Sequence, residues 1–252
     1  MLELTRQGQA DVITIRRPEA RNALRIADKA RLIELLKEAD ESDSRAIILT
    51  GEGDKAYCAG TDVKEMSTFT VADGLGMLTV ERDVCDVMIG LDKPIISALN
   101  GTAAGAGCVM VYCSDIAIAA EHALIGQPEV KHGAPAGLHV ALLPRVVGLA
   151  RARTMLYTAE FLTAHEAKEI GLISEVVAAD RLMDRAFELV ERIAALPEQA
   201  IRLQKRAIEA YIREPVDAAI NSTLYMVATA FQSDVPKQVI GQWVRTRGSS
   251  AA

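Results

Sequence analysis

Short apolar runs recur along the first 180 residues and alternate with segments of helical periodicity. The runs cover residues 47–49, 95–99, 116–119 and 173–177, and polar residues or glycines bound them. Runs of this length and composition are typical of buried strands. Residues 11–18 instead alternate apolar and polar positions before a proline, which predicts a half-buried strand. Strands separated by helices predict the α/β class.

Helical periodicity is clear between residues 23 and 40, directly after Asn22. We predict that the buried face of this helix carries apolar side chains three or four residues apart, namely Ile26, Ala30, Ile33 and Leu35 or Leu36. Residues 67–92 also predict a helix. Its start is ambiguous because glycines interrupt the pattern at residues 73–76.

Strand signals end at Arg181, and three helical segments follow. They cover residues 181–197, 198–215 and 216–232, and each is closed by a proline. We therefore expect a core over residues 1–190 and a C-terminal helical region over residues 191–252. The apolar faces of these helices suit packing on the same chain or on another subunit.

Composition narrows the classes of function. With 252 residues, of which 50% are apolar and 25% charged, the chain can bury a sizeable core. A formal net charge of −6 disfavours nucleic acid as a partner, since phosphate binding relies on clustered Lys and Arg. No apolar run approaches the roughly 20 residues of a membrane-spanning helix, and no signal peptide is evident. We expect a cytoplasmic protein that does not bind membranes.

The four cysteines are Cys58, Cys85, Cys108 and Cys113. They form no CxxC pair and have no histidine at metal-ligand spacing, so neither a metal site nor a redox motif is predicted. We expect them to be buried, reduced and structural.

Glycines cluster after the apolar run at 95–99, at Gly101, Gly105 and Gly107, and a similar turn occurs at Gly60 before a helix start. Such turns serve either a tight change of direction or the close approach of a ligand. The spacing also matches the GxxxGxG turn of short-chain dehydrogenases. That reading fails because about one hundred residues precede the turn and no tyrosine has a lysine four residues later.

Several ordered motifs resemble the crotonase, or enoyl-CoA hydratase and isomerase, superfamily. RRPEARNAL is similar to its RPEALNAL segment, KAYCAGTDVKEM to AFxAGxDxKEM, and NGTAAGAGCVMVYCSDIAIA to NGxAxGGGxELxxxCDxxxA. IGQPEVKHG and TAEFLTAHEAKEIGLISEVV match later motifs. The resemblance extends from about Asp11 to about Arg206. It implies a spiral of repeated strand-strand-helix turns, followed by helices that form a trimer or hexamer.

The resemblance also implies a chemistry. Members polarise an acyl-CoA thioester carbonyl with two backbone N–H groups, which by motif position belong to Thr61 and Ala106. Hydratases of the superfamily add two glutamates that hold a water. Here the first position is Val109, and the second is Glu129. One carboxylate can move a proton between carbons, so the pattern favours double-bond isomerisation over hydration.

A second departure follows Glu129. The PGxGG turn of the family is replaced by APAGLH, which draws attention to His132 and His139 as candidate additional acid/base groups. Two alternatives stay open, the first motivated by Val109 and these histidines, and the second by the glutamate lost at position 109. One is a hydrolase or retro-Claisen enzyme that cleaves C–C bonds with a histidine, and the other is a catalytically silent acyl-CoA-binding protein.

The resemblance places coenzyme A contacts on the segment before the first helix and on the AGTD loop. The matching positions are Arg21, Ala23, Ala59, Asp62, Val63 and Lys64. Coenzyme A enters as part of the substrate, and no separate cofactor or metal is expected. The segment from Ser67 to Leu91 would line the acyl pocket, but the acyl length cannot be read from it.

Overall fold

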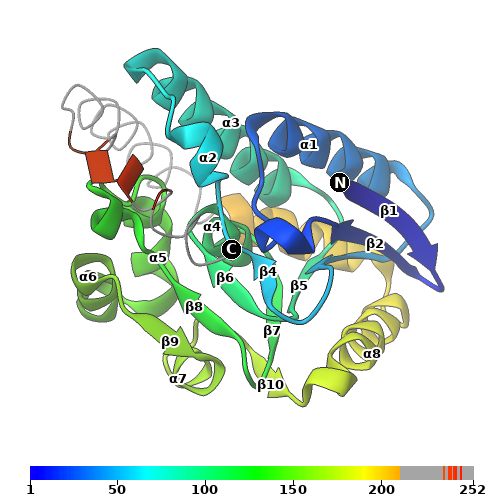
Figure 1. Cartoon of the computed structure of the whole chain (residues 1–252). Coiled ribbons are helices and arrows are strands. Elements are labelled where there is room, and N and C mark those ends of the chain that lie inside the picture. Colours follow the sequence, from blue (N-terminus) through cyan, green and yellow to red (C-terminus); the bar gives the residue numbers. More distant parts are fainter. Residues whose placement is uncertain (211–234, 236–237, 240, 243–244, 246–252) are drawn as a thin grey trace.

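The computed structural model describes residues 1–210, 235, 238–239, 241–242 and 245. The third predicted C-terminal helix, residues 216–232, lies outside the described residues. A six-stranded sheet forms the centre of the described part (Figure 1). Its strands, in spatial order, are β1 (Leu2–Gln7), β2 (Ala10–Ile15), β3 (Ala46–Gly51), β5 (Ile95–Leu99), β7 (Ile116–Ala120) and β10 (Glu175–Val177).

Strands β2 to β10 of this sheet pair in parallel, and only β1 runs antiparallel to its neighbour β2. The four apolar runs of the sequence are β3, β5, β7 and β10, so the four predicted strands are confirmed, but β10 is half-buried at all three residues where a buried strand was expected. The prediction of a half-buried β2 was wrong. Helices cover both faces of the sheet, and all residues of β2 except Thr14 are buried.

Eight α-helices lie between residues 26 and 194. They are α1 (Ile26–Glu41), α2 (Val63–Met66), α3 (Val71–Gly90), α4 (Ala106–Tyr112), α5 (His139–Val147), α6 (Leu149–Thr158), α7 (Ala164–Glu169) and α8 (Leu182–Ala194). Single 3₁₀ turns occur at η1 (Pro18–Ala20), η2 (Glu129–His132) and η3 (Ala179–Arg181).

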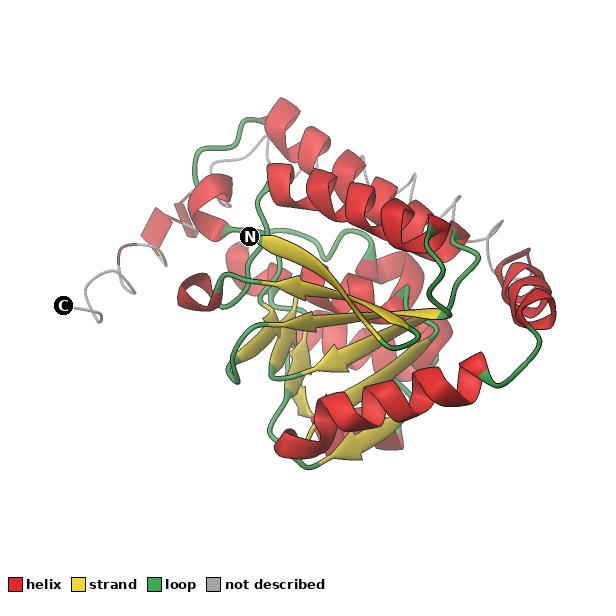
Figure 2. Cartoon of the chain, turned by 90° about the vertical axis from the view of Figure 1, so that its right-hand side faces the viewer, coloured by secondary structure: helices red, strands yellow, loops and turns green. Residues whose placement is uncertain are grey.

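Helices α1 and α3 lie together on one side of the larger sheet, and α8 lies on the other (Figure 2). The alternation of side chains along β3 explains this arrangement. Ile47 and Leu49 pack in the core beneath α1 and α3, whereas Ala46 and Ile48 pack against α8. Successive side chains of a strand point to opposite faces, so each face carries its own core.

The buried face of α1 differs from the predicted one. Ala30 is exposed, and Ile26 and Ile33 are only half-buried. The buried residues are Asp28, Lys29, Leu32, Leu35, Leu36 and Ala39. Two charged side chains therefore occupy the buried face, because each finds an oppositely charged partner: Asp28 bonds Arg25, and Lys29 bonds Glu81.

The ambiguous start of the second helix is resolved at Thr70. The Thr70 side chain accepts a hydrogen bond from the N–H of Asp73, and the Asp73 carboxylate accepts from the N–H of Thr70. This reciprocal capping fixes the first turn of α3 ahead of the glycines.

A smaller four-stranded sheet escaped the sequence prediction. Its spatial order is β4 (Ala56–Cys58), β6 (Thr102–Ala104), β8 (Leu124–Gly126) and β9 (Phe161–Thr163). Each of these strands has only three residues, which are too few to show the alternation of apolar and polar side chains that identifies a strand. Strands β4, β6 and β8 each follow a strand of the larger sheet, so the chain builds a spiral of strand-strand-helix turns, as the resemblance implied.

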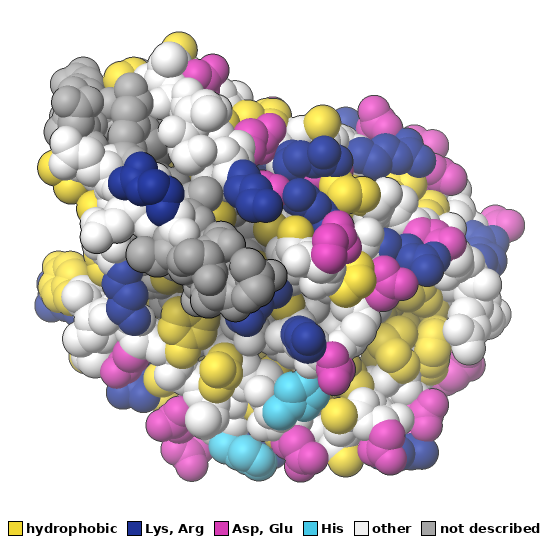
Figure 3. Space-filling model, viewed as in Figure 1, with side chains coloured by type: hydrophobic (Ala, Val, Ile, Leu, Met, Phe, Trp, Pro, Cys, Tyr) yellow, Lys and Arg dark blue, Asp and Glu magenta, His cyan; other side chains and the backbone are white. Residues whose placement is uncertain are grey.

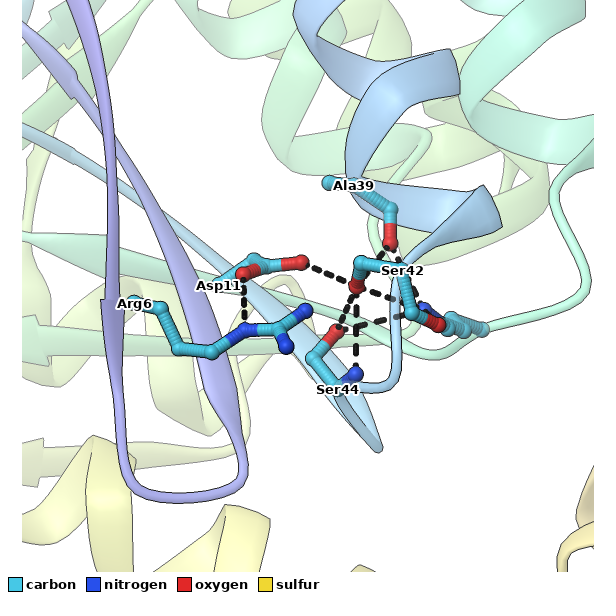
Figure 4. A network of polar contacts seen from close by, with 6 residues as sticks. Arg6, Asp11, Ala39, Ser42 and Ser44 are labelled. Atoms are coloured by element: carbon cyan, nitrogen blue, oxygen red, sulfur yellow. Dashed lines mark hydrogen bonds and ion pairs between the residues drawn. The ribbon is translucent and has the colours of Figure 1, made fainter.

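A polar network joins the first hairpin to the end of α1 (Figure 4). Buried Asp11 accepts hydrogen bonds from the Ser42 hydroxyl at 2.5 Å and from Arg6 Nε at 3.1 Å. Lys93 Nζ donates to the Ser42 hydroxyl from the start of β5. Burial alone raises the pKa of Asp11, but the bonds from Ser42, Arg6 and Ser44 outweigh it, so the net pKa is lowered.

The C-terminal part begins with α8, whose residues Leu182, Ala186, Leu189 and Val190 pack on the sheet. Residues 198–210 form the next described helix. Lys205 of that helix is buried and bonds Asp115 Oδ2 at 2.8 Å, which ties the helix to the core. The domain boundary near residue 190 stays a prediction.

On the face of the molecule seen in Figure 3, Lys and Arg side chains are interspersed with Asp and Glu. Among the described residues, no group of His, Cys, Asp and Glu is arranged to hold a metal ion. None of the described helices combines the length and apolarity needed to cross a membrane. All four cysteines are buried free thiols, and burial raises the pKa of Cys58 to about 12.

Candidate active site

Three segments singled out by the sequence follow three neighbouring strands of the smaller sheet. Strands β4, β6 and β8 are parallel, and their carboxyl ends meet at one edge. Residues 59–62 follow β4, residues 105–107 follow β6, and residues 127–129 follow β8. The sheet therefore brings Thr61, Ala106 and Glu129 to the same edge, although 68 positions of sequence separate the first from the last.

The two glycine turns pack directly on each other. A Cβ atom at Gly60 would lie 2.8 Å from Ala104 O and 3.1 Å from Ala106 N, and one at Gly105 would lie 3.8 Å from Gly60 Cα. Both glycines have positive φ, +94° and +50°. A Cβ atom at Gly60 would force the two turns apart, one at Gly105 would press on the Glu129 side chain, and both φ values favour glycine.

The N–H groups of Thr61 and Ala106 are left available by the surrounding backbone. Leu24 N–H donates to Gly60 O at 2.8 Å, and Asp62 N–H donates to Leu24 O at 2.9 Å. Thr61 lies between Gly60 and Asp62, which both bond Leu24. Successive peptide groups of an extended segment point to opposite sides, so the N–H of Thr61 points away from Leu24. Ala106 is the first residue of α4, where an N–H has no partner within the helix. Neither N–H donates to a backbone acceptor among the described residues, and two such donors side by side are what an oxyanion would require.

Glu129 lies above the second turn. A Cβ atom at Gly105 would be 3.1 Å from Glu129 Oε1, and the Glu129 side chain is 22% exposed. Its Oε2 atom is buried and has no hydrogen-bond partner among the described residues. The carboxylate thus stands beside the Ala106 N–H with one oxygen uncommitted. The preceding Gln127 is buried, and its side-chain amide donates to the Tyr112 hydroxyl.

His139 is the candidate histidine that lies against this carboxylate. Its Nε2 atom is 3.2 Å from Glu129 Oε1, and the residue is 3% exposed. The ring meets Tyr112 edge to face, with centroids 5.6 Å apart. The Nδ1 atom is buried without a partner in the described residues. His132 is the last residue of the 3₁₀ turn that begins at Glu129, and it is half-buried.

Helix α4 supplies two uncharged side chains of interest here, Tyr112 and Val109. Burial raises the pKa of Tyr112 well above its usual value, so its hydroxyl stays protonated. Val109 is 3% exposed and packs in the main core from α4. The position that carries a water-holding glutamate in hydratases is therefore filled here by a side chain with no polar atom.

The predicted coenzyme A positions lie on two segments that touch. Ala59 N–H donates to Arg21 O at 3.0 Å. Arg21 and Lys64 are exposed, Ala59 and Val63 are half-buried, and Ala23 is buried. The six positions therefore lie together, on the segment before α1 and on the loop after β4.

The Asp62 side chain is engaged within the protein. It accepts from the Lys64 N–H at 2.8 Å and from Arg17 Nη1 at 2.5 Å. Burial by itself raises the pKa of Asp62, but the bonds from Arg17 and Lys64 lower it more, so the carboxylate is ionised at neutral pH. Its side chain holds the loop that carries Thr61.

Three charged residues near the site were missed by the sequence analysis: Arg17, Lys29 and Glu81. Lys29 Nζ donates to Glu81 Oε1 at 2.5 Å and to the Thr61 hydroxyl at 2.7 Å. A signal existed for two of them. Lys29 is in helical register with Leu32 and Leu36, and Glu81 with Leu78 and Cys85, so both are charges on apolar stripes.

Comparisons with known proteins show what the chain is similar to. The model of the enoyl-CoA hydratase/isomerase family matches residues 5–249. A short-chain-enoyl-CoA hydratase of Clostridium acetobutylicum is 33% identical over 247 residues, covering 97% of this chain and 94% of the relative. A crotonyl-CoA hydratase of Syntrophomonas wolfei is 34% identical, covering 86% and 85%.

A solved structure extends the likeness to three dimensions. The enoyl-CoA hydratase of Bacillus anthracis superposes with a TM-score of 0.80 at 32% identity, over 92% of this chain and 89% of that one. Sequence and fold therefore agree over nearly the whole chain. The chain belongs to the enoyl-CoA hydratase/isomerase family of the crotonase superfamily, and is an enzyme of that kind.

Proposed function

We propose that this enzyme moves the double bond of an enoyl-CoA thioester. The N–H groups of Thr61 and Ala106 donate to the thioester oxygen. Glu129 removes a proton from the carbon beside the carbonyl, and negative charge collects on the oxygen as a dienolate forms. The protonated Glu129 then returns the proton to the far end of the conjugated system, and the carbonyl re-forms with the double bond displaced. No water enters this sequence.

The observation that carries the proposal is that Glu129 has no second carboxylate at position 109, where a buried valine stands. Glu129 Oε1 lies over Gly105, next to one donor, while Val109 offers no atom to hold a water. A shuttled proton needs one carboxylate that reaches two carbons, whereas a water needs two fixed partners. His139 lies close enough to orient the carboxylate.

Hydration is the second candidate, and two observations favour it. The named relatives are hydratases. In addition, the buried Nδ1 of His139 and Oε2 of Glu129 both lack partners in the described residues, and a water could bond to such atoms. In this reading His139 replaces the missing second glutamate.

For the rest of the substrate, Arg21 and Lys64 are the exposed cations we assign to the phosphates of coenzyme A. Coenzyme A would be carried as part of the substrate. Assembly into a homotrimer or hexamer, and a cytoplasmic location, belong to the same proposal.

The test is a panel of 2-enoyl- and 3-enoyl-CoA thioesters of increasing acyl length. Double-bond migration is followed by the ultraviolet band of the conjugated thioester, and hydration by chromatography of the hydroxyacyl product. Migration faster than hydration supports the first candidate. Hydration as the dominant reaction would replace it with the second, and turnover of neither would overturn both.

A further inference from the structure

The ion pair between Lys29 and Glu81 is buried at the edge of the site. Lys29 comes from α1, and its side chain is 2% exposed; Glu81 comes from α3, and its side chain is 12% exposed. Their charged atoms are 2.5 Å apart. Apolar residues otherwise dominate the packing between these helices, among them Leu32 and Cys85.

Both members of the pair bond the same hydroxyl. Lys29 Nζ donates to Thr61 Oγ1 at 2.7 Å, and Thr61 Oγ1 donates to Glu81 Oε1 at 2.7 Å. The hydroxyl therefore accepts one hydrogen bond and donates another, which fixes the rotamer of Thr61. Three elements, α1, α3 and the loop after β4, meet at this one oxygen atom.

The backbone around Thr61 needs such a support. Gly60, just before it, has a φ of +94° and no side chain, and the peptide that carries the Thr61 N–H is held through its carbonyl oxygen, Gly60 O, which accepts from Leu24 N–H at 2.8 Å. The bridge to Leu24 holds the loop on one side only. The side-chain bonds of Thr61 hold it on the other.

A buried ion pair is a poor device for stability alone. Removing two charges from water is costly, and apolar replacements of similar size are often neutral or stabilising. Burial by itself raises the pKa of Glu81, but Lys29 and the Thr61 hydroxyl lower it more, so Glu81 is ionised at neutral pH. Lys29 and Glu81 are both charged in spite of the cost of desolvation, and they lie beside the candidate site. This points to a role in that site.

We propose that Lys29 and Glu81 are positioning residues of the oxyanion hole, which lock the Thr61 hydroxyl and thereby aim the Thr61 N–H at the thioester oxygen. The proposal rests on the proposed function only in assigning that N–H to the oxygen. Neither residue touches the reacting carbons. Their loss would leave substrate binding nearly intact and weaken carbonyl polarisation.

Two sets of variants test this role. Lys29→Met combined with Glu81→Met removes both charges at similar volume, and Thr61→Val removes only the hydroxyl. Each should lower kcat by about 10- to 100-fold, the scale of a misplaced or lost oxyanion donor, with little change in KM. Combining them should cost hardly more than either set, because both act through one contact. Thr61→Ser, which keeps the hydroxyl, should recover most of the loss seen with Val.

The direct readout is the carbonyl stretching band of a bound acyl-CoA thioester, measured by isotope-edited infrared difference spectroscopy. The wild-type protein should shift the band to lower frequency relative to solution, and both sets of variants should shift it less. The control is Arg185→Met with Glu175→Met, an ion pair with bonds of 2.7 and 2.8 Å that joins α8 to β10. That variant should keep the wild-type band and kcat.

Unchanged kcat and an unchanged band in both sets would overturn the proposal, and so would lower stability with a wild-type band. If the double variant does not fold, Thr61→Val still decides the question. Failure of the proposed function is distinguishable. A wild-type protein that shifts the carbonyl band but turns over no enoyl-CoA overturns the reaction and leaves the positioning role in place.

Discussion

His139 Nε2 lies 3.2 Å from Glu129 Oε1, although the two residues belong to different helical elements and face each other across the turn at residues 133–138. The contact leaves the carboxylate with one committed and one uncommitted oxygen. Glu129 is thus oriented by a neighbour and still free to handle a proton.

Replacing Glu129 by Gln should reduce kcat by about 10²- to 10⁴-fold, the usual contribution of a general base. The amide keeps the shape of the side chain, so the dissociation constant for an acyl-CoA ester should stay close to that of the wild-type protein. Steady-state kinetics and calorimetric titration measure the two quantities. Glu121→Gln, at an exposed position, is the matched control. Retained turnover in Glu129→Gln would remove this residue from the mechanism.

His139→Asn should lower kcat by roughly 10- to 100-fold, since a contact to a charged group contributes about 1.5–3 kcal/mol. The two candidate reactions predict different patterns. If His139 only orients Glu129, migration and hydration fall together; if it holds a water, hydration falls further. His165→Asn, at an exposed histidine, serves as the control. Wild-type rates for both reactions would show that the contact has no catalytic role.

Val109→Glu should raise the ratio of hydration to migration, because it places a second carboxylate two residues beyond the glycine turn. A burial cost is expected, since Val109 is 3% exposed, and the unfolding free energy should fall by a few kcal/mol. Val109→Gln, which has nearly the same shape without the charge, separates the carboxylate from the change in volume. An unaltered product ratio in folded Val109→Glu would contradict the interpretation that hydration is disfavoured because a second carboxylate is missing at position 109.

Gly60→Ala should destabilise the protein by about 1–3 kcal/mol and abolish most activity, because it strains a positive φ and drives a Cβ to within 2.8 Å of Ala104 O. Gly76→Ala is the matched control. No atom lies within 4 Å of its Cβ position on α3, and Ala is the better helix former, so a gain of about 0.5–1 kcal/mol is expected. Thermal unfolding of both variants tests the contrast.

Asp11→Asn tests the network at the end of α1. The folded-state pKa of Asp11 is lowered, so its ionised form adds stability that is present above the unfolded pKa of about 4 and is lost as pH falls through the folded value. The variant should be less stable at pH 7 by about 1.5–3 kcal/mol. The difference should shrink below about pH 4, where the wild-type carboxyl also becomes protonated.

Urea unfolding at several pH values measures that difference. Asp43→Asn, at an exposed neighbouring aspartate, should show no comparable loss. A destabilisation of Asp11→Asn that stays constant down to pH 3 would mean that the charge of Asp11 is not its cause.

Much of the fold was readable from the sequence, because the long strands carry their own pattern. The run at 47–49 is apolar on every residue, and the structure buries it on both faces. The strand Ala56–Cys58 had no comparable signal, since three residues cannot show a period. The face of α1 was misplaced for a different reason: its periodicity was read from apolar residues alone, whereas Lys29 is buried because it pairs with Glu81, 52 positions away.

The candidate site was predictable only where a contiguous motif marked it. Thr61, Ala106 and Glu129 each follow a recognisable segment, and the smaller sheet gathers these segments at one edge. The contact of His139 with Glu129 depends on how the chain turns between them, and the bond of Arg17 to Asp62 spans 45 positions. Such pairs arise from tertiary packing, which no local pattern records.

The proposed oxyanion donors at Thr61 and Ala106 are main-chain groups, which affects how related sequences can diverge. A main-chain N–H survives every substitution except proline, so in the proposed mechanism both donors persist when their side chains change, although loss of the Thr61 hydroxyl would misalign its N–H. The carboxylate enjoys no such protection, because a single base change can delete it. In the proposed mechanism the carboxylate can be lost while carbonyl polarisation persists, and the tightest steric constraint falls on Gly60, where a Cβ atom would lie 2.8 Å from Ala104 O.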